Sequence, residues 1–192
     1  MKRPATASIV VFVAVILVAA VIAGFLWFGT DGATAITVGD TRVSAKAVND
    51  ELRVVAGAQT AQAQTTDGSV DSRLSAQVAS QIVYERLIDH YLAQVGERIS
   101  GADRTAARAQ VSDSTFAKLP KWFQDRYVAR FAAFVAFSRL KGDPNDQNAE
   151  LRAVRRLAKR AGVSVDPVYG RWNPTKARVL PWPTPADLQA GA

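Results

Sequence analysis

The sequence predicts a mainly helical protein with one membrane-spanning helix at its N-terminus. Residues 9–28 are apolar throughout. Apolar residues recur at helical spacing through most of the remaining chain, and only short stretches near residues 36–43 and 163–165 alternate like strands. We therefore expect an anchor within residues 1–30, a helical domain over residues 36–172, and a Pro-rich, partly disordered tail over residues 173–192.

The N-terminal segment Ile9–Phe28 contains only Ile, Val, Phe, Ala, Leu, Gly and Trp. A bilayer core of about 30 Å requires about 20 apolar residues, and backbone groups inside lipid must bond one another, which favours a helix. Lys2 and Arg3 precede the segment, and Asp31 is the first charge after it. Because positive charge stays in the cytoplasm, the body is expected outside the cytoplasm, held at the cell membrane.

A cleaved signal peptide is the alternative to a retained anchor. Ala33-Thr34-Ala35 is a small-x-small pattern that signal peptidase could cut after Ala35. Secretory signals usually have an apolar core of about 7–15 residues, which is shorter than this one. The chain has no cysteine, so a lipid anchor and disulfides are excluded. These observations favour a signal-anchor.

Length and charge set limits on the rest of the chain. Removing the first 30 of the 192 residues leaves enough for one domain. The chain carries 24 basic and 17 acidic residues, a net charge of +7. The basic excess favours anionic lipid headgroups or acidic partners, and the expected location disfavours nucleic acid.

The body is expected to begin with two short strands. Ile36–Val38 alternates like a strand, Gly39-Asp40 predicts a turn, and Thr41–Val43 resumes the extended pattern. Ser44 is a suitable N-cap for a first helix, whose apolar positions are Val48, Leu52 and Val55. Residues 57–70 are small and polar, which predicts a loop.

Two helices are expected in the middle of the chain. The first covers about Asp71–Val95, and Gly96 suits its C-cap. The second covers about residues 101–111, where Ser100 and Asp103 form an approximate capping box.

Two further helices and a strand complete the body. A helix is expected over about residues 115–140, where Pro120 either kinks it or marks its true start. Asp143-Pro144 ends this helix and begins the next, which runs to about Ala161 and stops at Gly162. Val163–Val165 then alternates like a strand.

Aromatic residues concentrate in the expected helix over residues 115–140. Phe123, Tyr127, Phe131 and Phe134 fall on one helical stripe. Core packing explains a stripe, but any surface left over would bind an unfolded chain or a partner helix. The candidate apolar surface comprises Trp122, Phe123, Tyr127, Phe131, Phe134 and Phe137.

A basic face is expected on the helix that ends at Ala161. Its cations alternate with the apolar positions and so lie on the opposite side of the helix. Simple solvation explains such a face, and docking to anionic lipid or to an acidic partner is the alternative. The residues are Arg152, Arg155, Arg156, Lys159 and Arg160.

The residues that catalysis or metal binding usually requires are scarce. His90 is the only histidine, and there is no cysteine. Glu85 and Asp89 share a helix face, but no second histidine joins them, which favours a structural or solvated pair. We expect no enzymatic activity, cofactor or metal.

Taken in order, several segments resemble the chaperone domain of SurA/PrsA-type extracytoplasmic foldases. They are Ile36–Asp40, the helix capped by Ser44, Ile82–Leu92, Ile99–Asp103 and Val163–Trp172. The resemblance implies a helical lobe closed by a two-strand antiparallel pairing between the late strand and the early one.

One departure from that family bears on function. The larger members carry a parvulin-type prolyl isomerase domain, and only Lys141–Gln147 separates the two helices where it would be inserted. The resemblance therefore implies a chaperone-like protein without isomerase activity, which binds unfolded or assembling exported and membrane proteins. The alternative is a structural accessory subunit of a larger membrane complex.

Overall fold

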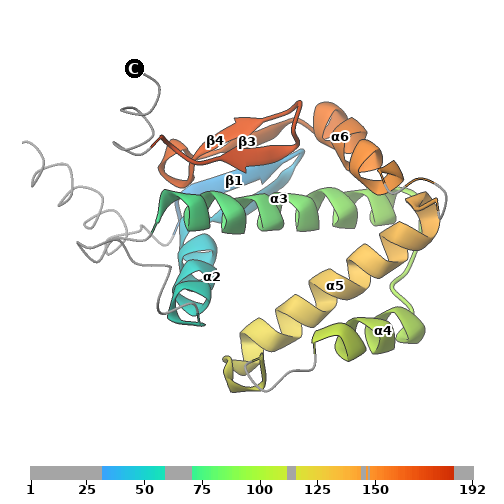
Figure 1. Ribbon diagram of the computed structural model, residues 1–192. Helices are drawn as coiled ribbons and strands as arrows, with labels where there is room; N and C mark the ends of the chain where they lie inside the picture. Colours follow the sequence, from blue (N-terminus) through green and yellow to red (C-terminus); the bar gives the residue numbers. More distant parts are fainter. Residues whose placement is uncertain (1–31, 59–70, 112–115, 144–145, 147, 184–192) are drawn as a thin grey trace, which may run out of the picture.

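The computed structural model describes residues 32–58, 71–111, 116–143, 146 and 148–183 (Figure 1). This part is mainly helical with small antiparallel sheets, as the sequence predicted. The expected anchor Ile9–Phe28, most of the expected loop at 57–70 and the end of the tail lie outside the described residues. Within the described ranges, no helix combines the length and the apolar character needed to cross a bilayer.

Three strands join the two ends of the body. Strands β1 (Thr34–Val38), β2 (Thr41–Ser44) and β3 (Val163–Val165) form an antiparallel sheet in the order β2-β1-β3. Ile36 is paired with Val43 on one side and with Val165 on the other. The expected pairing of the late strand with the early one is confirmed, but the sheet has three strands, not two.

The small-x-small pattern lies at the start of this sheet. Ala35 is buried within β1, and its carbonyl accepts a hydrogen bond from the Asp166 N–H at 2.7 Å. The carbonyl of Ala33 accepts one from the Ala45 N–H at 2.8 Å. Cleavage after Ala35 would therefore remove both hydrogen bonds and shorten the central strand.

Helix α3 (Ser72–Gln94) lies at the centre of the body. Helices α2 (Ala45–Ala58), α5 (Lys121–Lys141) and α6 (Ala149–Ala161) all pack against it. The expected N-cap of α2 is present, since Ser44 Oγ accepts a hydrogen bond from the Ala47 N–H. Asp71, predicted as the first residue of α3, is its N-cap and accepts a hydrogen bond from the Arg73 N–H. Gly96 follows α3 with a φ of 68°, a left-handed conformation that favours glycine.

Helices α4 (Gly101–Val111) and α5 (Lys121–Lys141) pack along each other on one side of α3 (Figure 1). The predicted capping box of α4 is confirmed, since Ser100 and Asp103 exchange hydrogen bonds. Pro120 is the N-cap of α5, so it marks the start of the helix and not a kink. The short 3₁₀ helix η1 (Phe116–Lys118) precedes it and corrects the predicted start at residue 115.

Helix α6 (Ala149–Ala161) begins at Ala149, later than the predicted start at Asp143-Pro144. It ends before Gly162, as predicted, and leads into β3. The 3₁₀ helix η2 (Pro167–Tyr169) follows. Strands β4 (Arg171–Asn173) and β5 (Arg178–Leu180) then form an antiparallel hairpin that packs on α3.

The hairpin corrects the prediction of a partly disordered tail that begins at residue 173. Ala177 and Val179 are buried, and the Val179 N–H donates a hydrogen bond to Ser80 Oγ at 2.8 Å. The buried side of β5 covers apolar side chains of α3 that would otherwise be exposed to solvent. The folded body therefore extends to at least Leu180.

Substitution of Phe137 tests which face of α5 packs into the core. Its ring is fully buried and meets Tyr91 edge-on, with centroids 5.6 Å apart. We expect Phe137→Ala to lower the free energy of unfolding by about 3–5 kcal/mol. Phe134→Ala, which removes an exposed ring from the same helix, is expected to cost less than about 1 kcal/mol. Equal losses in urea unfolding would contradict this arrangement.

Candidate functional site

The candidate aromatic side chains of α5 divide into three groups by burial. Phe123 and Phe137 are buried. Tyr127 and Phe131 are half-buried. Trp122 and Phe134 remain 45% and 38% exposed. The helix therefore keeps part of its aromatic surface available to solvent.

The rings form one continuous row along α5, called here the aromatic row: Trp122, Phe123, Tyr127, Phe131 and Phe134. Successive ring centroids are 5.7, 6.0, 6.4 and 6.1 Å apart. Phe116 of η1 contacts Tyr127 from the side. Phe137, which the sequence grouped with these residues, packs instead against α3 through Tyr91.

The rotation of α5 explains why the row is only partly covered. Arg126, Arg130, Ala133 and Phe137 follow one helical face, which meets α2 and α3. Consecutive residues on a helix are rotated by about 100°. Most of the row therefore lies beside the packed face and not in it.

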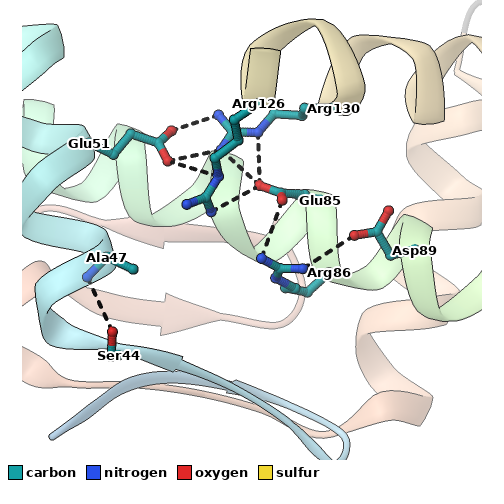
Figure 2. A network of polar contacts seen from close by, with 8 residues as sticks. All are labelled: Ser44, Ala47, Glu51, Glu85, Arg86, Asp89, Arg126 and Arg130. Atoms are coloured by element: carbon teal, nitrogen blue, oxygen red, sulfur yellow. Dashed lines mark hydrogen bonds and ion pairs between the residues drawn. The ribbon is translucent and has the colours of Figure 1, made fainter. Parts of the chain in front are cut away.

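Four charged side chains hold this face of α5 in place (Figure 2). The Arg130 guanidinium donates to both Glu51 oxygens, at 2.7 and 3.0 Å, and to Glu85 Oε2 at 2.8 Å. Arg126 Nη2 donates to the same Glu85 oxygen at 3.3 Å, and Arg126 Nε lies 3.6 Å from Glu51. The ion-pair network, as we call these four residues, thus joins α5 to α2 and α3.

The electrostatics of the ion-pair network are close to balanced. Glu51 is 1% exposed, and the network contains two carboxylates and two guanidinium groups. Burial alone would raise the pKa of Glu85, but the charges of Arg130 and Arg126 hold that pKa below its usual value. A carboxylate this enclosed is stable only while its partners remain.

The ion-pair network was not predicted from the sequence. The sequence placed Glu85 beside Asp89 as a structural or solvated pair, and in the structure Arg86 lies 3.3 Å from Glu85 and 3.4 Å from Asp89 and so bridges the two carboxylates at the edge of the network. Burial, followed by the charge of Glu85, raises the pKa of Asp89. Two features of the sequence could have indicated the network. Arg126 and Arg130 are spaced i, i+4, and Glu51 lies between apolar positions of α2.

The residues considered for catalysis or metal binding do not converge. His90 contacts Gln94 one helical turn away, with Nε2 atoms 2.9 Å apart. No group of three or more potential metal ligands occurs among the described residues.

Four of the five cations of the predicted basic face of α6 are exposed, and one of them, Arg152, pairs with Asp146. Arg152, Arg156, Lys159 and Arg160 are exposed, whereas Ala153, Val154 and Ala158 on the other side are buried. Arg155 is half-buried. Burial raises the pKa of the Tyr84 phenol on α3, and the nearby charge of Arg155 partly offsets this rise. The face is separate from the aromatic row.

An open depression of about 490 Å³ lies between the end of α2 and the start of α5. Its lining combines aliphatic groups with two cations and contains no carboxylate: Arg53, Val54, Gly57, Ala58, Lys118, Leu119 and Pro120. It adjoins the first turn of α5, where the aromatic row begins. It therefore offers additional apolar contact and no chemically reactive group.

No protein-family model, curated protein or solved structure matched this chain. The resemblance to the SurA/PrsA chaperone domain thus stays a prediction. The side chains themselves offer apolar contact along the aromatic row and positive charge on α6.

Arg130 tests the ion-pair network directly. We expect Arg130→Met to lower the free energy of unfolding by about 3–5 kcal/mol, because it leaves Glu51 and Glu85 buried with too few partners. Lys121→Met removes an exposed pair with Asp125 on the same helix and should cost at most about 1 kcal/mol. Similar losses in the two variants, measured by urea unfolding, would argue against a buried network.

The pH dependence of stability tests Glu85 and Asp89 with opposite signs. Because the folded-state pKa of Glu85 is lowered, its stabilisation is complete above its unfolded pKa and is lost as pH falls through the folded value. Asp89 has a raised pKa, so it favours folding at low pH and loses that contribution as pH rises through the folded value.

Denaturant unfolding between about pH 5 and pH 3 separates the two carboxylates. Glu85→Gln should flatten the decline in stability on acidification, whereas Asp89→Asn should steepen it. A slope that neither substitution changes would mean that other groups control acid stability.

Proposed function

We propose that this protein is a membrane-anchored, extracytoplasmic binding protein that holds apolar segments of exported or assembling membrane proteins without catalysis. The observation that carries the proposal is the aromatic row. It remains partly exposed along a well-packed helix, with Trp122 at one end and Phe134 at the other.

The chemistry of the aromatic row suits apolar polypeptide. Phe123 and Phe134 are eleven residues apart, which on a helix corresponds to about 16 Å. That length matches several residues of an extended chain or three turns of an amphipathic helix. Aromatic rings bind many apolar side chains, because the attraction depends on area and not on a specific hydrogen bond. We therefore expect broad selectivity.

The ion-pair network supports this binding by fixing α5 before a client arrives. Arg126 and Arg130 hold the helix against Glu51 and Glu85 from one side, while α4 packs along it. A surface that is already ordered loses less conformational entropy on binding. The contact with a client then needs no rearrangement of the domain.

The expected anchor fits this role. Five residues separate Phe28 from Thr34, the first residue of β1, so the two lie at most about 22 Å apart when the connection is extended. The hydrogen bonds of Ala33 and Ala35 favour a retained N-terminal segment, because cleavage would remove part of the sheet. Clients would be chains that lie at, or emerge from, the same membrane. A SurA-like chaperone lobe remains part of this proposal.

Substitution of the two exposed ends of the row tests the proposed function. The probe is reduced, carboxymethylated lactalbumin, a permanently unfolded chain, titrated against the full protein in lipid nanodiscs. We expect Trp122→Gln combined with Phe134→Gln to weaken binding at least tenfold, about 1.4 kcal/mol. Both side chains are exposed, so the domain should stay folded.

A matched control uses exposed apolar residues outside the row. Val95→Gln combined with Leu140→Gln removes two such side chains and should leave the affinity unchanged. Equal effects of the two double variants would reject the row as the binding surface. No binding of the unfolded probe, together with one stoichiometric partner in detergent extracts, would favour the accessory-subunit alternative.

A further inference from the structure

The positive charge of this protein is concentrated at one end of the chain. Residues 149–183 contain eight basic and two acidic residues, a net charge of +6, whereas the whole chain carries +7. Nearly all of the excess therefore belongs to α6, β3 and the β4–β5 hairpin. If the charged residues were spread evenly along the chain, residues 149–183 would carry only a small share of its net charge.

These elements lie together on the side of α3 opposite to α4 and the start of α5 (Figure 1). The hairpin and α6 both pack on α3, and β3 contacts β4. Burial raises the pKa of the Tyr84 phenol on α3, and the charges of Arg155 of α6 and Arg178 of β5 partly offset this rise. Both cations therefore lie near the same side chain. The hairpin carries three cations, Arg171, Lys176 and Arg178, and all three are exposed.

An aromatic side chain lies at the other end of this side, next to the start of β1. Trp182 is 48% exposed, and its indole N–H donates to the Pro167 carbonyl at 2.7 Å. Val168 beside it is also exposed. The neighbouring Asp166 bonds to Ala35 of β1, so this corner lies where the chain enters the body from the expected anchor.

We infer that this side of the body lies on the bilayer, with the cations of α6 and the hairpin against anionic phospholipid headgroups and Trp182 at the interface. Tryptophan favours the membrane–water boundary, and clustered Lys and Arg are attracted to anionic lipid. The 23-residue helix α3 would then run along the membrane, about 35 Å in length. An acidic polypeptide is a less suitable occupant, because it would not explain the exposed Trp182 and Val168 near the start of β1.

This inference rests on the membrane anchor of the proposed function and orients its binding site. With α6 and the hairpin on the lipid, α4 and the start of α5, where the aromatic row begins, lie on the side of α3 that is away from the bilayer (Figure 1). Exported chains would then reach Trp122 and Phe134 without passing between the body and the lipid.

Energy transfer from the full, membrane-inserted chain to a headgroup-attached dye tests this orientation. The chain has no cysteine, so Thr175→Cys in the hairpin turn and Ala106→Cys on α4 each place one donor dye at an exposed site. In vesicles of phosphatidylcholine with phosphatidylglycerol, we expect stronger transfer from position 175 than from position 106. Raising the salt concentration should remove most of the difference.

Charge variants identify the residues responsible. Replacing Arg152, Arg156, Lys159 and Arg160 by Gln should reduce transfer from position 175 to the level of position 106. The matched control replaces four exposed cations of α2, η1 and α4 by Gln and should change nothing: Arg53, Arg104, Arg108 and Lys118. An orientation that does not depend on the α6 cations would overturn the inference.

Equal energy transfer from positions 175 and 106 would also overturn the inferred orientation. If polyglutamate then bound the wild type but not the α6 variant, the basic face of α6 would be assigned to an acidic polypeptide. If the N-terminal segment does not insert in the membrane, no energy transfer would occur from either position in vesicles of pure phosphatidylcholine. This result distinguishes a missing anchor from a wrong orientation. Binding of the unfolded lactalbumin probe should be the same in the α6 variant and the wild type. The orientation and the client site can therefore fail independently.

Discussion

The position of α5 depends on the ion-pair network of Glu51, Glu85, Arg126 and Arg130. Its carboxylates come from α2 and α3, and its guanidinium groups come from two consecutive turns of α5. Buried charges add little net stability when compared with apolar side chains, but they are costly to separate. The network therefore favours one docking position of α5 over nearby alternatives, which a surface of Ala and Phe alone would specify less sharply.

The exposure of the aromatic row follows from this constraint. Arg126 and Arg130 are directed at Glu51 and Glu85 (Figure 2). Because consecutive helical residues are rotated by about 100°, the side chains one position further along α5 lie beside the packed face. Tyr127 and Phe131 are consequently half-buried. The same two arginines thus fix the position of the helix and determine which aromatic surface remains exposed to solvent.

The helices were predictable because their signals are local: Ser44, Asp71 and Gly162 mark ends that the structure has. The hairpin was missed because four prolines suggested an extended tail, while the burial of Val179 depends on α3, almost one hundred residues earlier. The ion-pair network was missed for the same reason, since Glu51 and Arg130 are 79 positions apart. The aromatic residues were found by their spacing, but their exposure depends on the rotation of α5, which periodicity alone does not specify.

The central claim is that apolar polypeptide contacts the aromatic row directly. Photo-crosslinking from a benzophenone amino acid at position 134, in the full chain inserted in vesicles, measures this contact most directly. We predict adducts with reduced, carboxymethylated lactalbumin from position 134 and few from position 95, which is more exposed to solvent but lies outside the row. Equal adduct yields from the two positions, or none from position 134, would contradict the claim.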